Sequence, residues 1–369
     1  MATDSARRIA ISTGGGDAPG LNAVIRAAVL AALGEGWECA GIRDGYNGLL
    51  DPDAYPEGGL MPLGRREVRG ITHLGGTIIG TTNRGDPLAY PIRQEDGSVL
   101  EVDRSGELIE AFGKAGIDAL IAIGGDGSMR IANRLSELGL PVIGVPKTID
   151  NDLEGTSVTF GFDTAVTFAT ECIDRLHTTA ESHDRLMVIE VMGRYAGWIA
   201  LHAGLAGSAD GILIPEIPYD LDSVAAKIAA REAAGQHFSI VVVAEGAHPH
   251  GGERSVIEYE PGQSKRLGGI GHRVADQLAA MTGKETRIVV LGHLLRGGGP
   301  TTRDRILSLR FGAAAIRALR EGITGCMVAL DPPDVRYVPL KQVTGRMKCV
   351  PVNSDTVRTV RDLGISLGD

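Results

Sequence analysis

Short apolar runs alternate with longer amphipathic segments along most of the chain. The runs at residues 9–13, 119–123, 141–145 and 286–291 have the length of buried strands. Between such runs the apolar residues recur with the period of a helix, as they do in residues 303–320. Strands that alternate with helices predict parallel sheets covered on both faces, and therefore an α/β fold.

The same alternation restarts in the second half of the chain. Residues 184–191 predict a strand that ends in the turn 192–197, and further strands are expected at 211–214 and 238–243. A chain of 369 residues is also longer than one simple core requires. We therefore expect two doubly wound domains with largely parallel sheets. Residues 335–369 show no clear pattern.

Composition and charge argue against several kinds of partner. The net charge of -9 disfavours nucleic acid or an anionic membrane surface as the main partner. No run approaches the ~18 apolar residues of a membrane span. The four cysteines have no metal-ligand spacing and are typical of thiols in a reducing cytoplasm, where we expect the protein to reside. They are Cys39, Cys172, Cys326 and Cys349.

Two glycine-rich turns each follow a predicted strand and open a predicted helix. They are Gly14–Asp17 (Gly-Gly-Gly-Asp) and Gly124–Ser128 (Gly-Gly-Asp-Gly-Ser). Glycine lets the backbone approach phosphate oxygens, a helix N-terminus attracts anions, and the aspartate of such a turn suits Mg²⁺. A purely structural tight turn is the alternative for either one. The repetition of the pattern favours phosphate binding.

The stretch Pro146–Asp152 (Pro-Lys-Thr-Ile-Asp-Asn-Asp) follows the predicted strand 141–145. Ligands bind at strand ends in open α/β sheets. Asp150 is the candidate general base, since a carboxylate held near a substrate hydroxyl accepts its proton. Asp152 is better explained as a cap of the following segment. A carboxylate-rich strand end near a glycine-rich one is typical of phosphoryl transfer.

Arginines occupy strand starts and ends in the second half. A single one is better explained as a solvated surface charge, but four of them suggest bidentate recognition of a sugar phosphate. His293 lies in a glycine-rich turn of the same half, where a contact to phosphate or hydroxyl competes with a structural role. The four arginines are Arg185, Arg194, Arg287 and Arg296.

Five stretches together resemble phosphofructokinases of the bacterial type, in the family's order and over roughly residues 9–325. They are Ser12–Arg26, Gly124–Ser128, Pro146–Asp152, Glu190–Gly197 and Leu291–Gly298. The resemblance implies transfer of a phosphoryl group to the 1-hydroxyl of fructose 6-phosphate. It implies a donor domain of residues 1–161 plus about 295–345, and a fructose 6-phosphate domain of residues 162–294 plus about 346–369. It also implies a homo-oligomer, expected to be a tetramer.

The resemblance carries roles to matching positions. Asp150 matches the proton acceptor, with Thr148 and Arg194 as further catalytic positions, and Asp126 matches the Mg²⁺-binding acid. Positions around the donor are Gly16, Asn83, Arg84, Gly125, Asp126, Gly127, Ser128 and Lys147. Positions around the sugar are Thr148, Ile149, Asp150, Arg185, Met192, Gly193, Arg194, Glu245, Arg287, His293, Leu294, Leu295 and Arg296. Arg185 and Arg287 match arginines that family members lend across a subunit interface.

Two positions indicate which phosphoryl donor the protein uses, and they favour different donors. In this family Gly127 leaves room for the α-phosphate of ATP, whereas Lys147 matches a lysine of pyrophosphate-dependent members. We expect ATP, because a nucleotide needs the space, whereas a lysine adds charge that suits either donor; pyrophosphate is the alternative. Asn83 and Arg84 stand where ATP-specific members have Arg-Phe, which puts the adenine contacts in doubt.

Other protein classes fit the motifs less well. A Rossmann dehydrogenase requires Gly-x-Gly-x-x-Gly after its first strand, and Gly14–Pro19 does not match. Lipid and NAD kinases share Gly-Gly-Asp-Gly but not the Thr148–Asp152 run. A non-catalytic regulatory paralogue would be expected to lose Asp150 or Asp126, and both are present.

Overall fold

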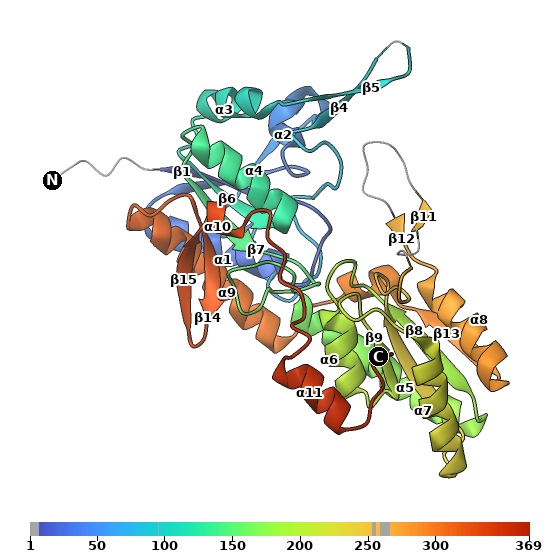
Figure 1. The fold of residues 1–369 in the computed structure, drawn as a ribbon. Coiled ribbons are helices and arrows are strands. Elements are labelled where there is room, and N and C mark those ends of the chain that lie inside the picture. Colours follow the sequence, from blue (N-terminus) through green and yellow to red (C-terminus); the bar gives the residue numbers. More distant parts are fainter. Residues whose placement is uncertain (1–6, 95, 253–255, 259–265) are drawn as a thin grey trace. The chain divides into compact units, whose positions relative to one another are not determined.

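The computed structural model describes residues 7–94, 96–252, 256–258 and 266–369, which pack as two units (Figure 1). The first unit comprises Met1–Thr148, Leu153–Gly161 and Arg296–Met347. The second comprises Ile149–Asp152, Phe162–Leu295 and Lys348–Asp369. The division expected from the sequence differs most at residues 149–152, which it assigned to the first domain and which belong here to the second unit.

The first unit contains a seven-stranded sheet in the order β15-β14-β7-β6-β1-β2-β3. Its central strands β2, β1, β6, β7 and β14 are parallel, and the edge strands β3 and β15 are antiparallel. These strands are β1 (Arg8–Thr13), β2 (Glu38–Ile42), β3 (Leu60–Pro62), β6 (Ala119–Gly124), β7 (Val142–Pro146), β14 (Cys326–Asp331) and β15 (Asp334–Pro339). A separate hairpin joins β4 (Tyr90–Arg93) and β5 (Val99–Val102).

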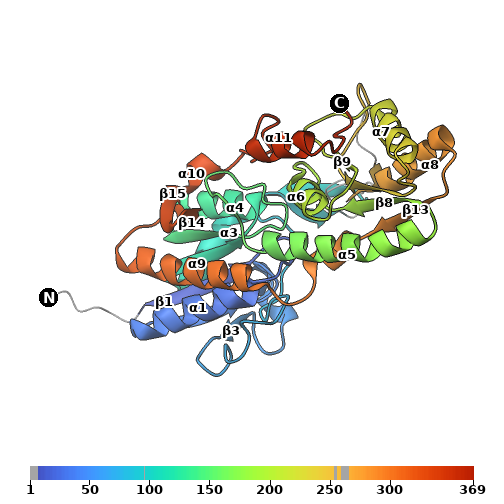
Figure 2. The same ribbon diagram turned by 90° about the horizontal axis from the view of Figure 1, so that it is seen from below.

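Helices cover both faces of this sheet. Successive strand residues point to opposite faces, so Ile9 and Ile121 join one apolar core while Ala10 and Leu120 join another. The first core packs under α1 (Leu21–Gly34) and α9 (Thr302–Arg320), which lie side by side in Figure 2. The second core packs under α3 (Ser105–Lys114), α4 (Asp126–Glu137) and α10 (Leu340–Val343). Two short helical turns, α2 (Asn47–Leu50) and η1 (Pro52–Ala54), follow β2.

The second unit contains a four-stranded, fully parallel sheet in the order β13-β8-β10-β9. Its strands are β8 (Leu186–Val191), β9 (Gly211–Leu213), β10 (Ser239–Ala244) and β13 (Thr286–Val290). One face packs on α7 (Leu221–Ala233) and α8 (Ile270–Thr282), and the other on α5 (Phe162–Ser182) and α6 (Trp198–Ala206). A short antiparallel pair, β11 (Val256–Glu258) and β12 (Arg266–Leu267), lies apart from this sheet in the pairing pattern. The predicted α/β class with largely parallel sheets is confirmed.

The segment without a clear sequence pattern is ordered in both units. It forms β15 and α10 in the first unit and α11 (Asp355–Asp362) in the second. Its last residues pair with β9, where the amide of Ile212 donates to the carbonyl oxygen of Ser366 at 2.8 Å. Among the described residues, no helix is both long and apolar enough to cross a membrane.

Candidate active site

Two loops meet where β1 and β6 end in the first unit. These strands pair in parallel with Thr13 opposite Ile123, so the loops that follow them are neighbours. The amide of Gly14 donates a hydrogen bond of 2.9 Å to the carbonyl oxygen of Ile123. This bond joins the loop after β1 to the end of β6. Carboxyl ends of parallel strands are the usual ligand-binding edge of such sheets.

The glycines of these loops serve two different purposes. A Cβ atom at Gly14 would lie 2.6 Å from the Ser128 hydroxyl oxygen, and one at Gly124 would lie 2.0 Å from it. Packing therefore requires glycine at position 124, where the Ser128 Cβ would also lie at 2.2 Å, whereas a Cβ atom at position 14 would be too close only to the rotatable Ser128 hydroxyl. Apart from its chain neighbours and the nearby backbone of its own helix, a Cβ atom at Gly127 would meet no described atom within 4 Å. The fold does not require glycine there, and the space beside it is open to a ligand.

The α4 helix begins at this open space. Its N-cap residue Gly125 provides no side-chain hydrogen bond, so the first amides of the helix have no capping side chain among the described residues. An uncapped helix N-terminus reached over exposed glycine backbone is suited to bind phosphate. Gly125 is half-buried, Asp126 and Gly127 are exposed, and Ser128 is half-buried.

Asp126 fits a metal that is shared with bound phosphates. Its carboxylate is exposed and accepts one long hydrogen bond, 3.4 Å from the amide of Gly345. In the described part of the chain, no group of three or more His, Cys, Asp or Glu side chains could hold a metal alone. Mg²⁺ does not need such a cage, because it keeps several waters and binds through one or two carboxylates plus substrate phosphates.

Two cations hold the carbonyl oxygens of the first glycine loop. Lys147 is 3% exposed, and its ammonium group donates to the carbonyl oxygen of Gly16. Arg296 donates to the carbonyl oxygen of Asp17 at 3.1 Å, and a Cβ atom at Gly16 would lie 2.7 Å from its Nη1. Both positive charges therefore lie at the loop that is expected to receive a polyanion.

Arg296 is expected among the sugar-binding positions, and it is also the residue near which the expected donor domain resumes, at about residue 295. The structure places it in the first unit, against Gly16 and Asp17. The reason is that η2 (Gly292–Arg296) ends where the chain returns to the first unit.

A third segment lies beside the same loop. The amide of Gly15 donates to the carbonyl oxygen of Thr82 at 3.0 Å, and the Thr81 hydroxyl donates to the carbonyl oxygen of Gly15 at 2.7 Å. These bonds bring the exposed residues Asn83 and Arg84 next to the first glycine loop. The structure thus gathers all predicted donor residues, from Gly16 to Lys147, in the first unit.

The candidate base belongs to the other unit. Thr148 is the last residue of its segment in the first unit, where its carbonyl oxygen accepts from the Thr159 hydroxyl at 2.7 Å. Ile149 is fully buried in the second unit, and Asp150 follows it at intermediate exposure. The next residue, Asn151, is 4% exposed and has a left-handed backbone with φ of 52°.

Three strand ends of the second unit carry several of its predicted sugar-binding residues. The amide of Glu245 donates to the carbonyl oxygen of Val191 at 2.9 Å, so β10 and β8 end together. The amide of Leu291 donates to the carbonyl oxygen of Glu190 at 3.0 Å, so β13 ends there too. The residues that follow these strands include Met192, Gly193, Arg194, His293, Leu294 and Leu295.

The turn after β8 is fixed by close backbone packing. Gly193 has φ of 144°, which disfavours any side chain, and its carbonyl oxygen accepts from the amide of Gly246 at 3.1 Å. A Cβ atom at Gly246 would lie 2.1 Å from the carbonyl oxygen of Arg194. This packing fixes the backbone of Arg194.

The Arg194 side chain has hydrogen-bonding capacity left over. Its guanidinium carbon lies 4.9 Å from the centre of the Tyr195 ring, a cation–π distance. Its Nε is buried and has no hydrogen-bond partner among the described residues. A buried donor without an acceptor is costly, so a bound anion would stabilise it. His293 and Leu294 are exposed, whereas Leu295 is buried.

Arg185 and Arg287 lie at the opposite end of this sheet. Arg185 precedes β8, and Arg287 pairs with Met187 near the start of the same strand. Both guanidinium groups contact Glu285, with Arg185 at 2.9 Å. The hydrogen bond from Arg185 is the main cause that lowers the pKa of the Glu285 carboxyl. Within one unit, the structure does not bring this pair to Arg194.

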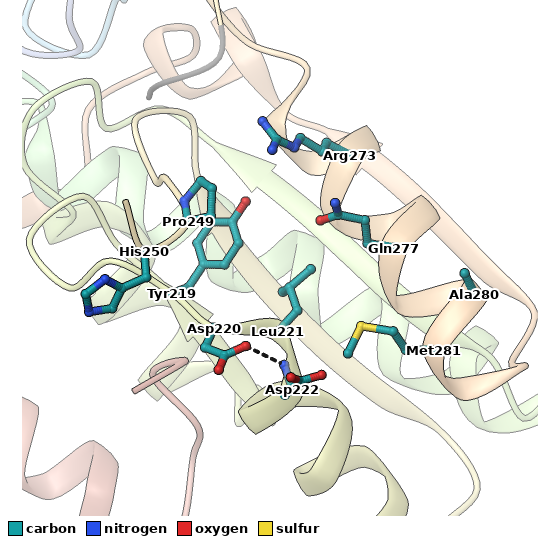
Figure 3. A pocket seen from close by; sticks show the side chains of 10 residues that line it. All are labelled: Tyr219, Asp220, Leu221, Asp222, Pro249, His250, Arg273, Gln277, Ala280 and Met281. Atoms are coloured by element: carbon teal, nitrogen blue, oxygen red, sulfur yellow. Dashed lines mark hydrogen bonds between the residues drawn. The ribbon is translucent and has the colours of Figure 1, made fainter. Parts of the chain in front are cut away.

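A cavity of about 440 Å³ in the second unit contains none of the predicted site residues. It lies among the start of α7, residues 249–250 and one face of α8, where Arg273 and Gln277 come from successive turns (Figure 3). The cavity is therefore separate from the strand ends that hold Arg194.

The sequence did not identify every residue that supports the site. Lys348 donates from its ammonium group to the Asn151 side-chain oxygen at 2.8 Å. Glu216 accepts from the amide of Gly197, at the start of α6, with 3.1 Å to each carboxylate oxygen. The proline before Glu216 at a strand end was the only local signal, and Lys348 lies where the sequence pattern was unclear.

Comparison with known proteins gives one consistent result. A family model described as Phosphofructokinase matches residues 8–319. An ATP-dependent 6-phosphofructokinase of Chloroflexus aurantiacus is 54% identical over 98% of this chain and 98% of that protein. A pyrophosphate–fructose 6-phosphate 1-phosphotransferase of Amycolatopsis mediterranei is 49% identical over 94% and 96%. The phosphofructokinase structure of Pichia pastoris matches 98% of this chain and 37% of that chain, with a TM-score of 0.78 and 30% identity.

The packing of the two glycine loops predicts a rescue experiment. Gly14→Ala places a methyl group against the Ser128 hydroxyl, and we expect a loss of about 1–3 kcal/mol, as for other overpacked sites. Ser128→Ala removes the hydroxyl and leaves a normal 3.6 Å carbon contact, so the double variant should regain most of the loss. Thermal unfolding of the three variants measures this. A double variant that is as unstable as Gly14→Ala alone would contradict the packing argument.

Proposed function

Since this chain belongs to the phosphofructokinase family, we propose that it transfers the γ-phosphoryl group of ATP to the 1-hydroxyl of fructose 6-phosphate. The products are ADP and fructose 1,6-bisphosphate, and the reaction is a step of glycolysis. Match to the family model over residues 8–319 supports the reaction class. The observation that carries the proposal is the uncapped N-terminus of α4, with exposed Asp126 and open space beside Gly127.

The first unit supplies the donor-binding groups. The amides at the start of α4 donate to phosphate oxygens, and Lys147 and Arg296 keep positive charge at the Gly16 loop. Asp126 would hold Mg²⁺ together with the donor phosphates. When bound, Mg²⁺ neutralises charge that develops on the transferring group. Asn83 and Arg84 lie next to the loop and would contact the rest of the donor.

The second unit supplies the acceptor-binding groups. Asp150 accepts the proton of the sugar's 1-hydroxyl group. As it does so, the hydroxyl oxygen bonds to the γ-phosphorus, and the bond between that phosphorus and the leaving ADP oxygen breaks. Two residues fix the backbone before Asp150. Thr148 ends a segment of the first unit, where its carbonyl oxygen accepts a hydrogen bond, and Ile149 is buried in the second unit. Arg194, whose buried Nε has no partner among the described residues, pairs with the phosphate group of the sugar phosphate. Glu245 and His293 are suited to bind the hydroxyl groups of the sugar.

ATP is the donor that the geometry supports better. The open space at Gly127 is not needed by the fold, which accords with a pocket kept for a nucleotide phosphate. The Lys147 charge is buried and engaged by the Gly16 carbonyl oxygen, so it stabilises the loop whichever donor binds. The Chloroflexus relative, at 54% identity, is named for ATP.

Pyrophosphate is the second candidate donor. It is favoured by Lys147 and by the Amycolatopsis relative, which is named for pyrophosphate at 49% identity. A regulatory paralogue without activity is disfavoured, because Asp126 and Asp150 are both retained. A glycolytic enzyme without nucleic-acid or membrane partners belongs in the cytoplasm, which is our proposal for its location.

We also propose that the active enzyme is a homo-oligomer, a tetramer by family resemblance. Arg185 and Arg287 lie at the end of the second unit's sheet that is opposite to Arg194. If they contact sugar phosphate, they do so in a neighbouring copy. Closed homo-oligomers commonly share sites in this way across a two-fold interface.

The role of Asp150 predicts a loss of turnover. Asp150→Ser removes the proton acceptor, and kcat should fall by a factor on the order of 10²–10⁴ with a much smaller change in the fructose 6-phosphate KM. Asp152→Ser is the matched control, since it makes the same change at a carboxylate two residues further on, and it should retain far more activity. Steady-state kinetics with ATP decide the matter. An Asp150→Ser enzyme with a tenth of wild-type kcat would reject the assignment.

The shared site predicts complementation. Asp150→Ser and Arg287→Ala chains should each be inactive, but a hybrid dimer contains one site with both residues intact. Equal mixing should therefore restore about a quarter of the wild-type activity, if chains combine at random. Hybrids separated by a tag and assayed directly give the measurement. Verified hybrids that stay inactive would show that Arg287 acts within its own chain.

The space at Gly127 predicts a donor effect. Gly127→Asp adds a carboxylate beside the donor phosphates, and like charges about 4 Å apart near a protein surface repel by up to roughly 4 kcal/mol. We expect kcat/KM for ATP to fall on the order of 10²-fold, while pyrophosphate use is kept or raised. Gly106→Asp is the matched control, because Gly106 is also the second residue of a helix and also has open space. Equal effects of both substitutions would contradict a donor pocket at Gly127.

A further inference from the structure

The C-terminal segment returns to the second unit directly beside the candidate base. Lys348 is the first residue of that segment, and it lies beyond the part of the chain that matches the family model. Its backbone amide donates to the carbonyl oxygen of Asp152 at 2.9 Å. Its ammonium group donates to the side-chain oxygen of Asn151 at 2.8 Å. One residue thus contacts both positions that follow Asp150.

Lys348 is itself held in place from the other side. The indole Nε1 of Trp198 donates to the Lys348 carbonyl oxygen at 2.9 Å, and the Lys348 ammonium lies 5.6 Å from the centre of the Trp198 ring. Two residues further on, the amide of Val350 donates to Glu216 at 2.8 Å. Glu216 also accepts from the amide of Gly197 at the start of α6. The segment is therefore anchored to the sheet-and-helix body of the second unit.

Asn151 adopts a backbone conformation that is uncommon outside glycine. Its φ of 52° lies in the left-handed region, where asparagine is enriched several-fold among non-glycine residues. The residue is 4% exposed, so its side-chain amide must be satisfied inside the protein. A hydrogen bond from a charged donor in a buried site is among the stronger ones. Lys348 therefore stabilises the backbone turn that directly follows Asp150.

We propose that Lys348 is a positioning residue for the phosphoryl-transfer reaction, which acts by fixing Asn151 and thereby the orientation of the Asp150 carboxylate. This inference rests on the proposed function, in which Asp150 is the base. It gives the C-terminal segment a role in turnover. In this role the segment acts on the chemical step more than on the binding of fructose 6-phosphate.

Lys348→Met tests the proposal. Methionine keeps an apolar chain against Trp198 and removes the charged donor. We expect kcat to fall about 10- to 100-fold, the loss that follows removal of a hydrogen bond to a charged group, with a smaller change in fructose 6-phosphate KM. Lys348→Arg should recover part of the loss, because it restores a charged donor. Lys341→Met, the same change at an exposed lysine in α10, should match the wild type.

A double variant separates positioning from general destabilisation. Asn151→Gly removes the acceptor amide and tolerates the left-handed backbone. If both residues act through one contact, the double variant Lys348→Met, Asn151→Gly should be no slower than the slower single variant. Two independent structural defects would instead multiply their effects on kcat.

The outcomes distinguish this proposal from the one on which it rests. A wild-type enzyme that phosphorylates fructose 6-phosphate with neither ATP nor pyrophosphate overturns the proposed function. An active wild type together with a Lys348→Met variant of unchanged kcat overturns the role of Lys348 alone. Two further outcomes overturn the role of Lys348. One is a double variant whose loss of kcat is the product of the two single losses. The other is a fall in kcat that equals the fall in the folded fraction measured by circular dichroism.

Discussion

The expected donor site in the first unit depends on one steric constraint, which is the close approach of the loops after β1 and β6. Parallel pairing puts these strand ends next to each other, and the Ser128 hydroxyl fills the space that side chains at positions 14 and 124 would need. Glycine at both positions lets the loops meet, and α4 can then begin with its amides open to solvent. That opening is suited to a polyphosphate, because exposed amides and the helix dipole favour negative charge.

The second unit shows the same kind of constraint at the ends of its own strands. Its three strand ends are joined by backbone hydrogen bonds, and Gly246 leaves no space for a side chain against the Arg194 backbone. The backbone at that point is fixed, and the buried Nε of Arg194 has no hydrogen-bond partner among the described residues. The residues after Ile149 are held separately, by Lys348 from the C-terminal segment. Preorganised groups of this kind reduce the cost of reaching the reactive geometry.

The sequence predicted those parts of the fold that are encoded locally. Apolar runs of strand length and the glycine turns after them predicted the parallel strands and donor loops, because burial and tight turns leave a signal within a few residues. Lys348 escaped prediction because its partner, Asn151, is remote in sequence and neither residue belongs to a periodic segment. The contact of Arg296 with the first glycine loop was not predicted for a similar reason, since the residues that precede it in sequence belong to the other unit. The sequence also could not tell glycines that the packing needs from glycines that leave space for a ligand. The packing around Gly124 and the open space at Gly127 make that distinction.

The central claim is that this chain phosphorylates fructose 6-phosphate and that the space at Gly127 serves a nucleotide. The most direct measurement is kcat/KM of the unmodified enzyme for ATP and for pyrophosphate, with fructose 6-phosphate saturating and Mg²⁺ present. We predict formation of fructose 1,6-bisphosphate with a higher kcat/KM for ATP. A higher value for pyrophosphate would contradict the assignment of the donor and give Lys147 more weight than Gly127, and no product with either donor would contradict the function itself.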